Sequence, residues 1–188
     1  PPAIPLMSSY RPEFEAALAA FARVSEAMAA AGRESPVLVG GAAVEIYTLG
    51  TINTGDFDIV TGAQFAFEAV LQDHGFIRPV GSGKATRGWI HPLLQLGFEI
   101  VSSTLLDGQA DRNRVRPIRV GDKGVIHVIA VEDMIADRMG QYASGTARDM
   151  LQQARALANL SERLDLDYME RRIRYETAGD YGIEDVIP

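Results

Sequence analysis

The stretch VLVGGAAVEIYTLGTINTGDFDIV, residues 37–60, contains the pattern from which we infer the fold. It begins with a short apolar run, typical of a buried strand, and continues through a Gly-Gly pair into an amphipathic octet that indicates a short helix. A loop follows, and Asp56, Phe57 and Asp58 then lead into a second apolar strand. Side chains two residues apart in a strand point to the same face. We therefore expect the two acids to project together while Phe57 faces the core.

A third acid stands alone in an apolar run further along the chain. The run LLQLGFEIVSS predicts a strand, and Glu99 lies within it. An unpaired buried carboxylate is costly, so this acid needs a partner. Neighbouring carboxylates repel one another unless something positive lies between them, and hard cations such as Mg²⁺ are bound through carboxylate oxygens. We expect Asp56, Asp58 and Glu99 to share two Mg²⁺ ions, the arrangement of two-metal phosphoryl chemistry.

Gly40 and Gly41 end the first strand and open the helix of this stretch. A backbone without side chains can approach a phosphate closely, and a helix N-terminus favours an anion. A tight turn without ligand is the alternative for the glycines, and a strand-entry turn with capping acids is the alternative for Asp56 and Asp58. The glycines are not a dinucleotide fingerprint, because the G-x-G-x-x-G spacing is absent.

A second glycine-containing stretch, GSGKATRG at residues 81–88, suggests a phosphate loop. The Walker spacing fails, because Arg78 stands at the position of the first glycine and Ala85 follows the lysine. We expect a flexible hairpin or lid instead, from which Lys84 or Arg87 would contact a triphosphate.

The rest of the chain predicts an α+β fold. Helices are expected at residues 11–31 and 63–75, and two further strands at 115–120 and 124–130. From residue 131 the pattern is helical. We therefore expect a mixed-sheet core with an N-terminal helix over residues 1–130, and a C-terminal helical region packed on it over residues 131–188.

Composition limits the classes of protein. The 188 residues are 47% hydrophobic and 23% charged, which is typical of a globular domain and excludes a disordered chain. The absence of cysteine excludes disulfides and thiolate metal sites, and it fits a reducing cytoplasm. No apolar run reaches the roughly 20 residues of a membrane span, so no membrane partner is expected.

The net charge of −7 disfavours wide, nonspecific contact with nucleic acid. Two clusters of arginine, DRNRVRPIR and ERRIR, are interpreted as solvated faces. Glu132 and Asp133 open a predicted helix, where the helix dipole favours acids.

The order of these motifs resembles the minimal nucleotidyltransferase superfamily. Members carry a Gly-Gly or Gly-Ser pair at a strand-to-helix turn, then a short helix, a Thr-x-Asp-x-Asp strand and a third acid on another strand. Gly40-Gly41, residues 54–58 and Glu99 match these positions. The helical region is similar to that of bacterial stand-alone members, including the toxin-like branch named for abortive infection. The positions matched there are Arg138, Arg148 and Asp149.

The resemblance implies transfer of a nucleoside monophosphate from a nucleoside triphosphate such as ATP to an acceptor hydroxyl. It implies metal binding by the three acids, with Glu99 as a general base, phosphate contacts from Gly40 and Gly41, and orientation of the loop by Thr54. Acceptors in the superfamily include RNA, proteins and small antibiotics, and the sequence does not choose among them.

Three departures from the family pattern favour an alternative, a non-catalytic relative that binds a partner protein or has a regulatory role. Gly41 replaces the serine of well-characterised transferases. The loop before Thr54 often carries an arginine in relatives, and Asn53 stands nearby in this chain. Glu99 replaces the commoner aspartate. A structural α/β domain that binds no nucleotide is a further alternative.

Overall fold

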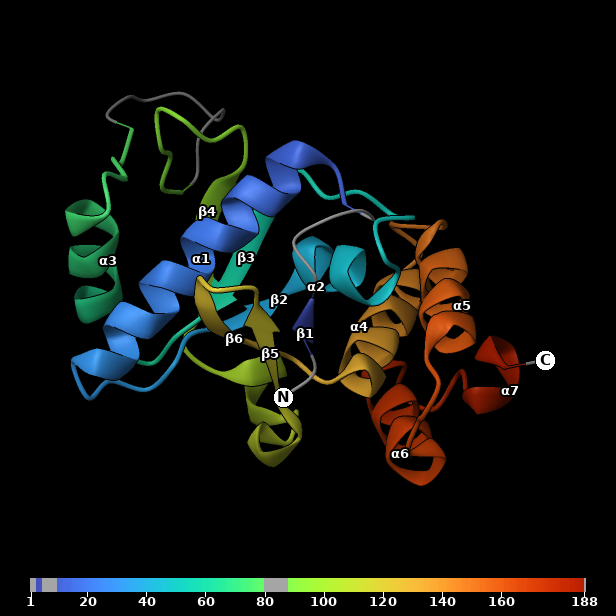
Figure 1. Ribbon diagram of the computed structural model, residues 1–188. Coiled ribbons are helices and arrows are strands. Elements are labelled where there is room, and N and C mark those ends of the chain that lie inside the picture. Colours follow the sequence, from blue (N-terminus) through green and yellow to red (C-terminus); the bar gives the residue numbers. More distant parts are fainter. Residues whose placement is uncertain (1–2, 5–9, 80–87, 188) are drawn as a thin grey trace.

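A computed structural model describes residues 3–4, 10–79 and 88–187. Its centre is a mixed six-stranded sheet with the order β1-β5-β6-β2-β3-β4 (Figure 1). The strands are β1 (Ala3–Ile4), β2 (Val37–Val39), β3 (Asp56–Val60), β4 (Gly97–Ser102), β5 (Arg116–Val120) and β6 (Gly124–Val128). The α+β class predicted from the sequence is therefore confirmed.

The pairing of the central strands determines where the acids lie. β2 runs parallel to β6 and antiparallel to β3, and β3 runs parallel to β4. The chain therefore leaves β2, passes through a short helix and returns beside it as β3. An isolated antiparallel bridge joins Ile77 to Ile90 outside the named strands.

Seven α-helices and two short 3-10 helices surround the sheet within the described residues. The α-helices are α1 (Pro12–Ala30), α2 (Gly40–Tyr47), α3 (Gln64–Asp73), α4 (Val131–Ala143), α5 (Met150–Leu160), α6 (Leu166–Glu176) and α7 (Ile183–Val186). The 3-10 helices are η1 (Leu105–Gly108) and η2 (Arg112–Arg114). None of the described helices is long and apolar enough to cross a membrane.

Helix α1 covers one face of the sheet (Figure 1). Aromatic side chains fill the contact between them. Phe57 is fully buried and its ring lies 5.2 Å from both Phe14 of α1 and Phe98 of β4. Phe21 meets the same two strand residues edge-on. Because Phe57 points towards α1, its neighbours Asp56 and Asp58 point to the opposite face, as the period of the strand predicts.

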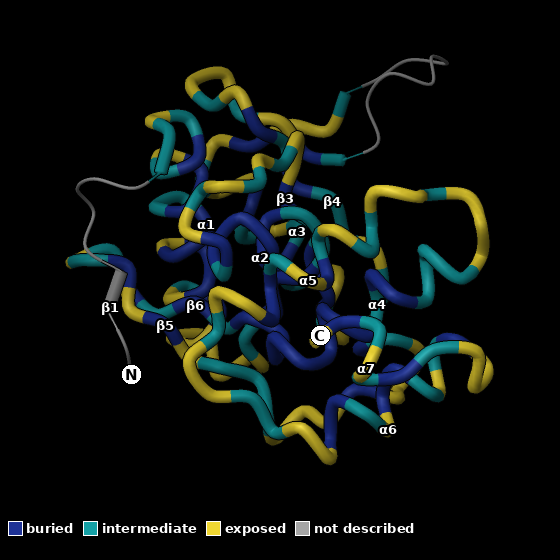
Figure 2. The backbone as a smooth tube through the Cα atoms, turned by 90° about the vertical axis from the view of Figure 1, so that its right-hand side faces the viewer, coloured by how far each residue is buried: buried dark blue, intermediate teal, exposed yellow. Residues whose placement is uncertain are grey.

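The C-terminal helices form a second packed group. α4 contacts both α5 and α6, and α2 of the core contacts α4 and α5. The boundary expected at residue 131 coincides with the start of α4. Figure 2 shows that the buried segments, in dark blue, continue from the sheet region into these helices.

Charged residues hold the seam where α4 meets α6 and β5. Glu132 and Asp133 open α4 as predicted, but the cluster ERRIR is not wholly a solvated face, because Arg172 is buried. Asp133 is fully buried, and it accepts hydrogen bonds from Arg172 at 2.7 Å and from the Tyr168 hydroxyl at 2.9 Å. Glu132 is also buried and pairs with Arg116. These pairs therefore hold α4 to α6 and to β5.

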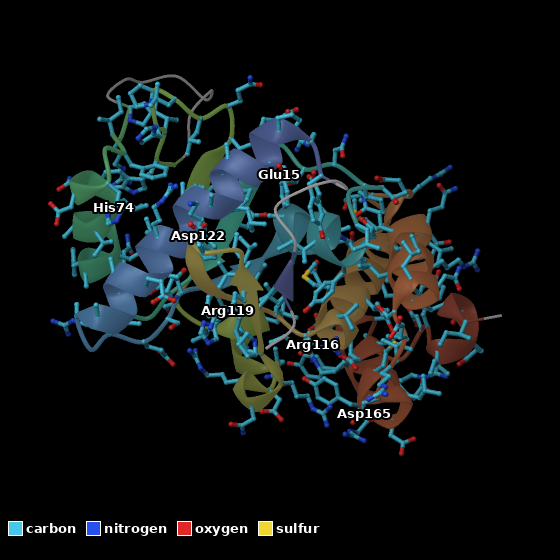
Figure 3. All side chains as sticks on the ribbon, in the orientation of Figure 1. Glu15, His74, Arg116, Arg119, Asp122 and Asp165 are labelled. Atoms are coloured by element: carbon cyan, nitrogen blue, oxygen red, sulfur yellow. The ribbon has the colours of Figure 1, made fainter. Side chains whose placement is uncertain are left out.

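Figure 3 places Arg116 and Asp165 at this seam, and Arg114 bonds to Asp165 at 2.9 Å. No local pattern indicates a partner for these charges, because the pairs join residues far apart in the chain.

The buried pair predicts a clear difference between two arginines of α6. Arg172→Ala leaves the Asp133 carboxylate buried without its cation, and we expect the free energy of unfolding to fall by about 3–5 kcal/mol. Arg174→Ala removes a partly exposed arginine that bonds to Glu170 and Glu184, and it should cost much less because solvent screens these pairs. Urea unfolding of both variants measures the difference, and equal losses would contradict this account of the seam.

Candidate functional site

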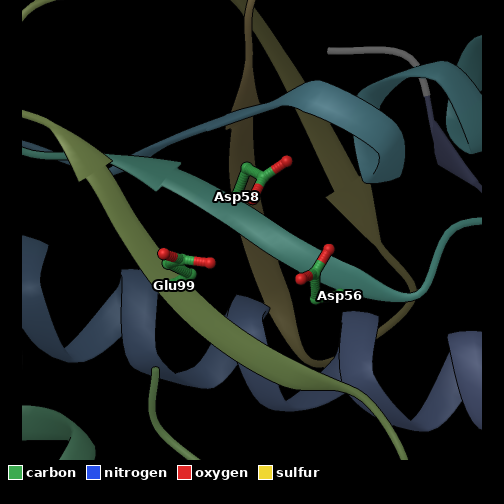
Figure 4. A group of neighbouring side chains, drawn as sticks. All are labelled: Asp56, Asp58 and Glu99. Atoms are coloured by element: carbon green, nitrogen blue, oxygen red, sulfur yellow. The ribbon is translucent and has the colours of Figure 1, made fainter. Parts of the chain in front are cut away.

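Strands β3 and β4 bring the three predicted acids together. Asp58 lies directly opposite Glu99 in the parallel pairing, and Asp56 lies opposite Gly97. One carboxylate oxygen of each acid lies within 4.8 Å of one oxygen of each of the others. Figure 4 shows all three side chains projecting from the same face of the two strands, with α1 on the other side. The expectation that these acids converge is therefore confirmed.

The Gly-Gly turn lies against Asp58. Val39 at the end of β2 is paired with Asp58, and Gly40 begins α2 with a positive φ of 61°. A Cβ atom on Gly40 would stand 2.9 Å from the Asp58 Cβ and still closer to its carboxylate. The close approach of Asp58 and the left-handed backbone both require glycine at position 40.

The electrostatic surroundings of Asp58 oppose its ionisation. Burial of this carboxylate, followed by the charges of Asp56 and Glu99, raises its pKa to about 6. The neighbouring Gly41 amide and the charge of Arg138 act in the opposite direction and lower that pKa. The net shift shows that the protein itself does not neutralise the cluster.

The donor set fits a hard divalent cation. All three groups are carboxylates, and no histidine or thiolate joins them among the described residues. Mg²⁺ and similar ions prefer oxygen ligands and are commonly held by one or two carboxylates together with substrate phosphates. Asp56, Asp58 and Glu99 are therefore the residues that would hold such an ion.

Arg138 of α4 also lies beside the three acids. A cavity of about 350 Å³ lies beside Asp58 and is lined by Gly40, Arg138 and Asp137, among others. The Arg138 side chain is only 8% exposed, and it is held by Asp137 at 2.7 Å and Gln153 at 3.0 Å. The cavity thus has an arginine and the start of a helix on its walls, which suits an anionic ligand.

Asp137 was not anticipated from the sequence, although it stands beside Arg138. It also lines the cavity next to Asp58, and burial raises its pKa. A second hollow, of about 400 Å³, lies on the Glu99 side of the acids and includes Gln64, Arg78 and Trp89 in its lining. The acid cluster therefore lies between two spaces large enough for ligand groups.

The remaining candidates lie at different places. The Thr54 hydroxyl donates to the Asp56 carbonyl at 3.0 Å, so Thr54 is part of the loop that presents the acids. Arg148 is exposed and lines another hollow, and the exposed Asp149 accepts a hydrogen bond from Gln153, which also bonds to Arg138. Lys84 and Arg87 lie outside the described residues.

Sequence reasoning missed Glu45 and Arg11. Glu45 of α2 is fully buried and accepts two hydrogen bonds from Arg11, at 3.0 and 3.1 Å. The signal was present, because Glu45 is a lone acid among apolar residues of the octet. Its partner lies 34 residues earlier, so no local pattern joins the two.

Comparison with known proteins adds no family assignment. No protein-family model matches the chain, and no curated protein is similar enough in sequence to count as a match.

The repulsion at Asp58 predicts how the metal-free protein responds to pH. A pKa raised by folding means that the native state binds more protons than the unfolded state between about pH 4 and 6. The contribution of Asp58 to stability is therefore present below pH 4 and lost as the pH rises through 6. Asp58→Asn removes this loss, so the variant should melt at a higher temperature than wild type at pH 7.5 in a chelator.

The advantage of Asp58→Asn should shrink towards pH 4, because wild-type Asp58 is then protonated. Solvent screens this half-buried carboxylate, and we expect a difference of about 1–2 kcal/mol at neutral pH. Differential scanning calorimetry across this range measures it. A variant that is less stable than wild type at pH 7.5 would instead show that Asp58 is a structural partner of Arg138.

Proposed function

We propose that this protein is a metal-dependent nucleotidyltransferase, which moves a nucleoside monophosphate from a nucleoside triphosphate to an acceptor hydroxyl. The observation that carries the proposal is the convergence of Asp56, Asp58 and Glu99 beside the Gly40-Gly41 turn. The order of β2, α2, β3 and β4 supports the resemblance to the minimal nucleotidyltransferase superfamily, because each motif stands on the element that this family would use.

The two spaces beside the acids suit a donor and an acceptor. The cavity beside Asp58 has Arg138 and the first turn of α2 on its walls, and the first amides of a helix have no partner within it. We place the triphosphate there. We place the acceptor in the hollow that Glu99 lines. In the reaction, the acceptor oxygen bonds to the α-phosphorus, the bond from that phosphorus to its bridging oxygen breaks, and pyrophosphate leaves.

Each acid has a role in this arrangement. Asp56, Asp58 and Glu99 would hold Mg²⁺, which when bound supplies positive charge for the phosphates and the attacking oxygen. A carboxylate oxygen of Glu99 would accept the proton of the acceptor hydroxyl, because Glu99 lines the hollow assigned to the acceptor. Gly41 cannot supply a serine hydroxyl. Arg138 therefore carries the larger share of the phosphate contact.

A non-catalytic relative that binds a nucleotide or a partner protein is the second candidate. The glycine at position 41 favours it, because no serine hydroxyl is then available to contact the phosphates.

A transfer assay tests the proposal. The protein is incubated with each labelled nucleoside triphosphate and Mg²⁺, with and without cell extract, and labelled products are separated. Asp56→Asn, Asp58→Asn and Glu99→Gln should each lose about a hundredfold or more in rate, since removal of a ligand exceeds the loss from an outer partner. Asp73→Asn, an exposed acid at the end of α3, is the control and should match wild type. Transfer that persists in Asp58→Asn would contradict the site.

Binding separates the two candidates. Wild type that binds Mg²⁺ and a nucleoside triphosphate without labelling any product supports the non-catalytic relative. Wild type that binds no nucleotide at millimolar concentration contradicts the transferase and makes a non-catalytic relative that binds a partner protein the better candidate.

Arg138 gives a prediction of its own. Charge-assisted hydrogen bonds contribute about 1.5–3 kcal/mol, so Arg138→Ala should weaken nucleotide binding by about ten- to a hundredfold. Titration calorimetry in Mg²⁺ measures the affinity, and the exposed Arg163→Ala is the matched control. Equal affinity in the two variants would exclude the cavity beside Asp58 as the triphosphate site.

A further inference from the structure

A partly buried ion pair lies beneath the loop that leads to the acids. The Glu45 carboxylate on α2 has no exposed surface. It accepts hydrogen bonds from the Nε of Arg11 at 3.0 Å, from the Nη2 of Arg11 at 3.1 Å and from the backbone amide of Thr54 at 2.7 Å. Arg11 is the residue from which α1 begins. The pair therefore ties together the start of α1, the middle of α2 and the loop before β3.

Both backbone polar groups of Thr54 are held by this pair. The Glu45 carboxylate accepts a hydrogen bond from the Thr54 amide, and the Nη2 of Arg11 donates one to the Thr54 carbonyl. The Thr54 side chain is fixed as well, because its hydroxyl bonds to the Asp56 carbonyl and because it lies against Gly41, where a Cβ atom would stand 3.0 Å from the Thr54 Cβ. Both the backbone and the side chain of Thr54 are therefore held in place, two residues before Asp56.

Asp56 needs such a restraint more than its neighbours do. It is the first residue of β3 and it is exposed, whereas Asp58 lies within the strand between β2 and β4. Repulsion from Asp58 and Glu99 pushes Asp56 towards solvent, and a loop residue at a strand end can yield to that push. The hydrogen bonds at Thr54 oppose this movement.

We propose that Arg11 and Glu45 are positioning residues that hold Asp56 within reach of a shared cation. This inference rests on the proposed function, because it assigns the pair to the metal site. Arg11 acts through Thr54 and does not touch the acids. A buried ion pair is weak support for stability, because apolar residues of similar volume often stabilise as well or better. Its placement on both polar groups of one loop residue therefore indicates a geometric role.

The test measures Mn²⁺ binding, which needs no substrate and no activity. Free Mn²⁺ is counted by electron paramagnetic resonance at a temperature where circular dichroism shows each variant folded. Arg11→Ala should weaken Mn²⁺ binding at least tenfold. Arg11→Lys keeps a charge for Glu45 but cannot reproduce the planar fork of donors, so it should weaken binding by a smaller factor.

Arg172→Ala is the matched control. It also removes a guanidinium from a fully buried carboxylate, but at the seam between α4 and α6. It should lower the melting temperature while leaving Mn²⁺ affinity within twofold of wild type. If Arg11→Ala does not fold, Arg11→Lys and Glu45→Gln decide, because both keep a polar partner for Thr54.

The outcomes separate this inference from the proposed function. If wild type binds Mn²⁺ and the folded Arg11 and Glu45 variants bind it with the same affinity, the positioning role is overturned. The metal site itself would remain supported. Equal weakening in Arg11→Ala and Arg172→Ala would overturn it too, because general loss of stability would then explain both. Wild type that binds no Mn²⁺ would overturn the proposed function and this inference with it.

Discussion

Asp56, Asp58 and Glu99 hold carboxylate oxygens within 4.8 Å of one another, and the repulsion between them has to be offset by the surrounding structure. The raised pKa of Asp58 shows that nearby protein groups offset it only in part. The parallel pairing of β3 with β4 fixes two of the acids opposite each other. Gly40 leaves the space that Asp58 occupies. Much of the local structure therefore maintains an arrangement that is unfavourable without a cation.

The stabilisation comes from the other face of the same strands. Phe57 lies between the two aspartates in sequence and packs against α1 and β4 through Phe14 and Phe98. Burial of these rings stabilises β3 on one face, and the carboxylates occupy the other. Because successive side chains of a strand point to opposite faces, Phe57 packs in the core while Asp56 and Asp58 lie at the site. A core on one face and a site on the other is a common division in proteins that place chemistry on a sheet.

The sequence predicted the acids and the glycines because their signals are local. Asp56 and Asp58 share a face by strand period, and Glu99 stands out as a lone acid in an apolar run. The pairs Arg11–Glu45 and Asp133–Arg172 were missed, because a charged residue gives no sign of a partner 34 or 39 positions away. Glu132 and Asp133 fit a helix start equally well whether exposed or buried. Only the packing of α4 against α6 distinguishes the two.

The central claim is that the three acids form a cation site. Anomalous diffraction from crystals grown with Mn²⁺ tests it most directly, because the scattering locates the ion without reference to activity. The account predicts an anomalous peak bounded by the carboxylates of Asp56, Asp58 and Glu99. Crystals with no peak at these carboxylates, and with Asp58 paired to Arg138 in its place, would contradict it.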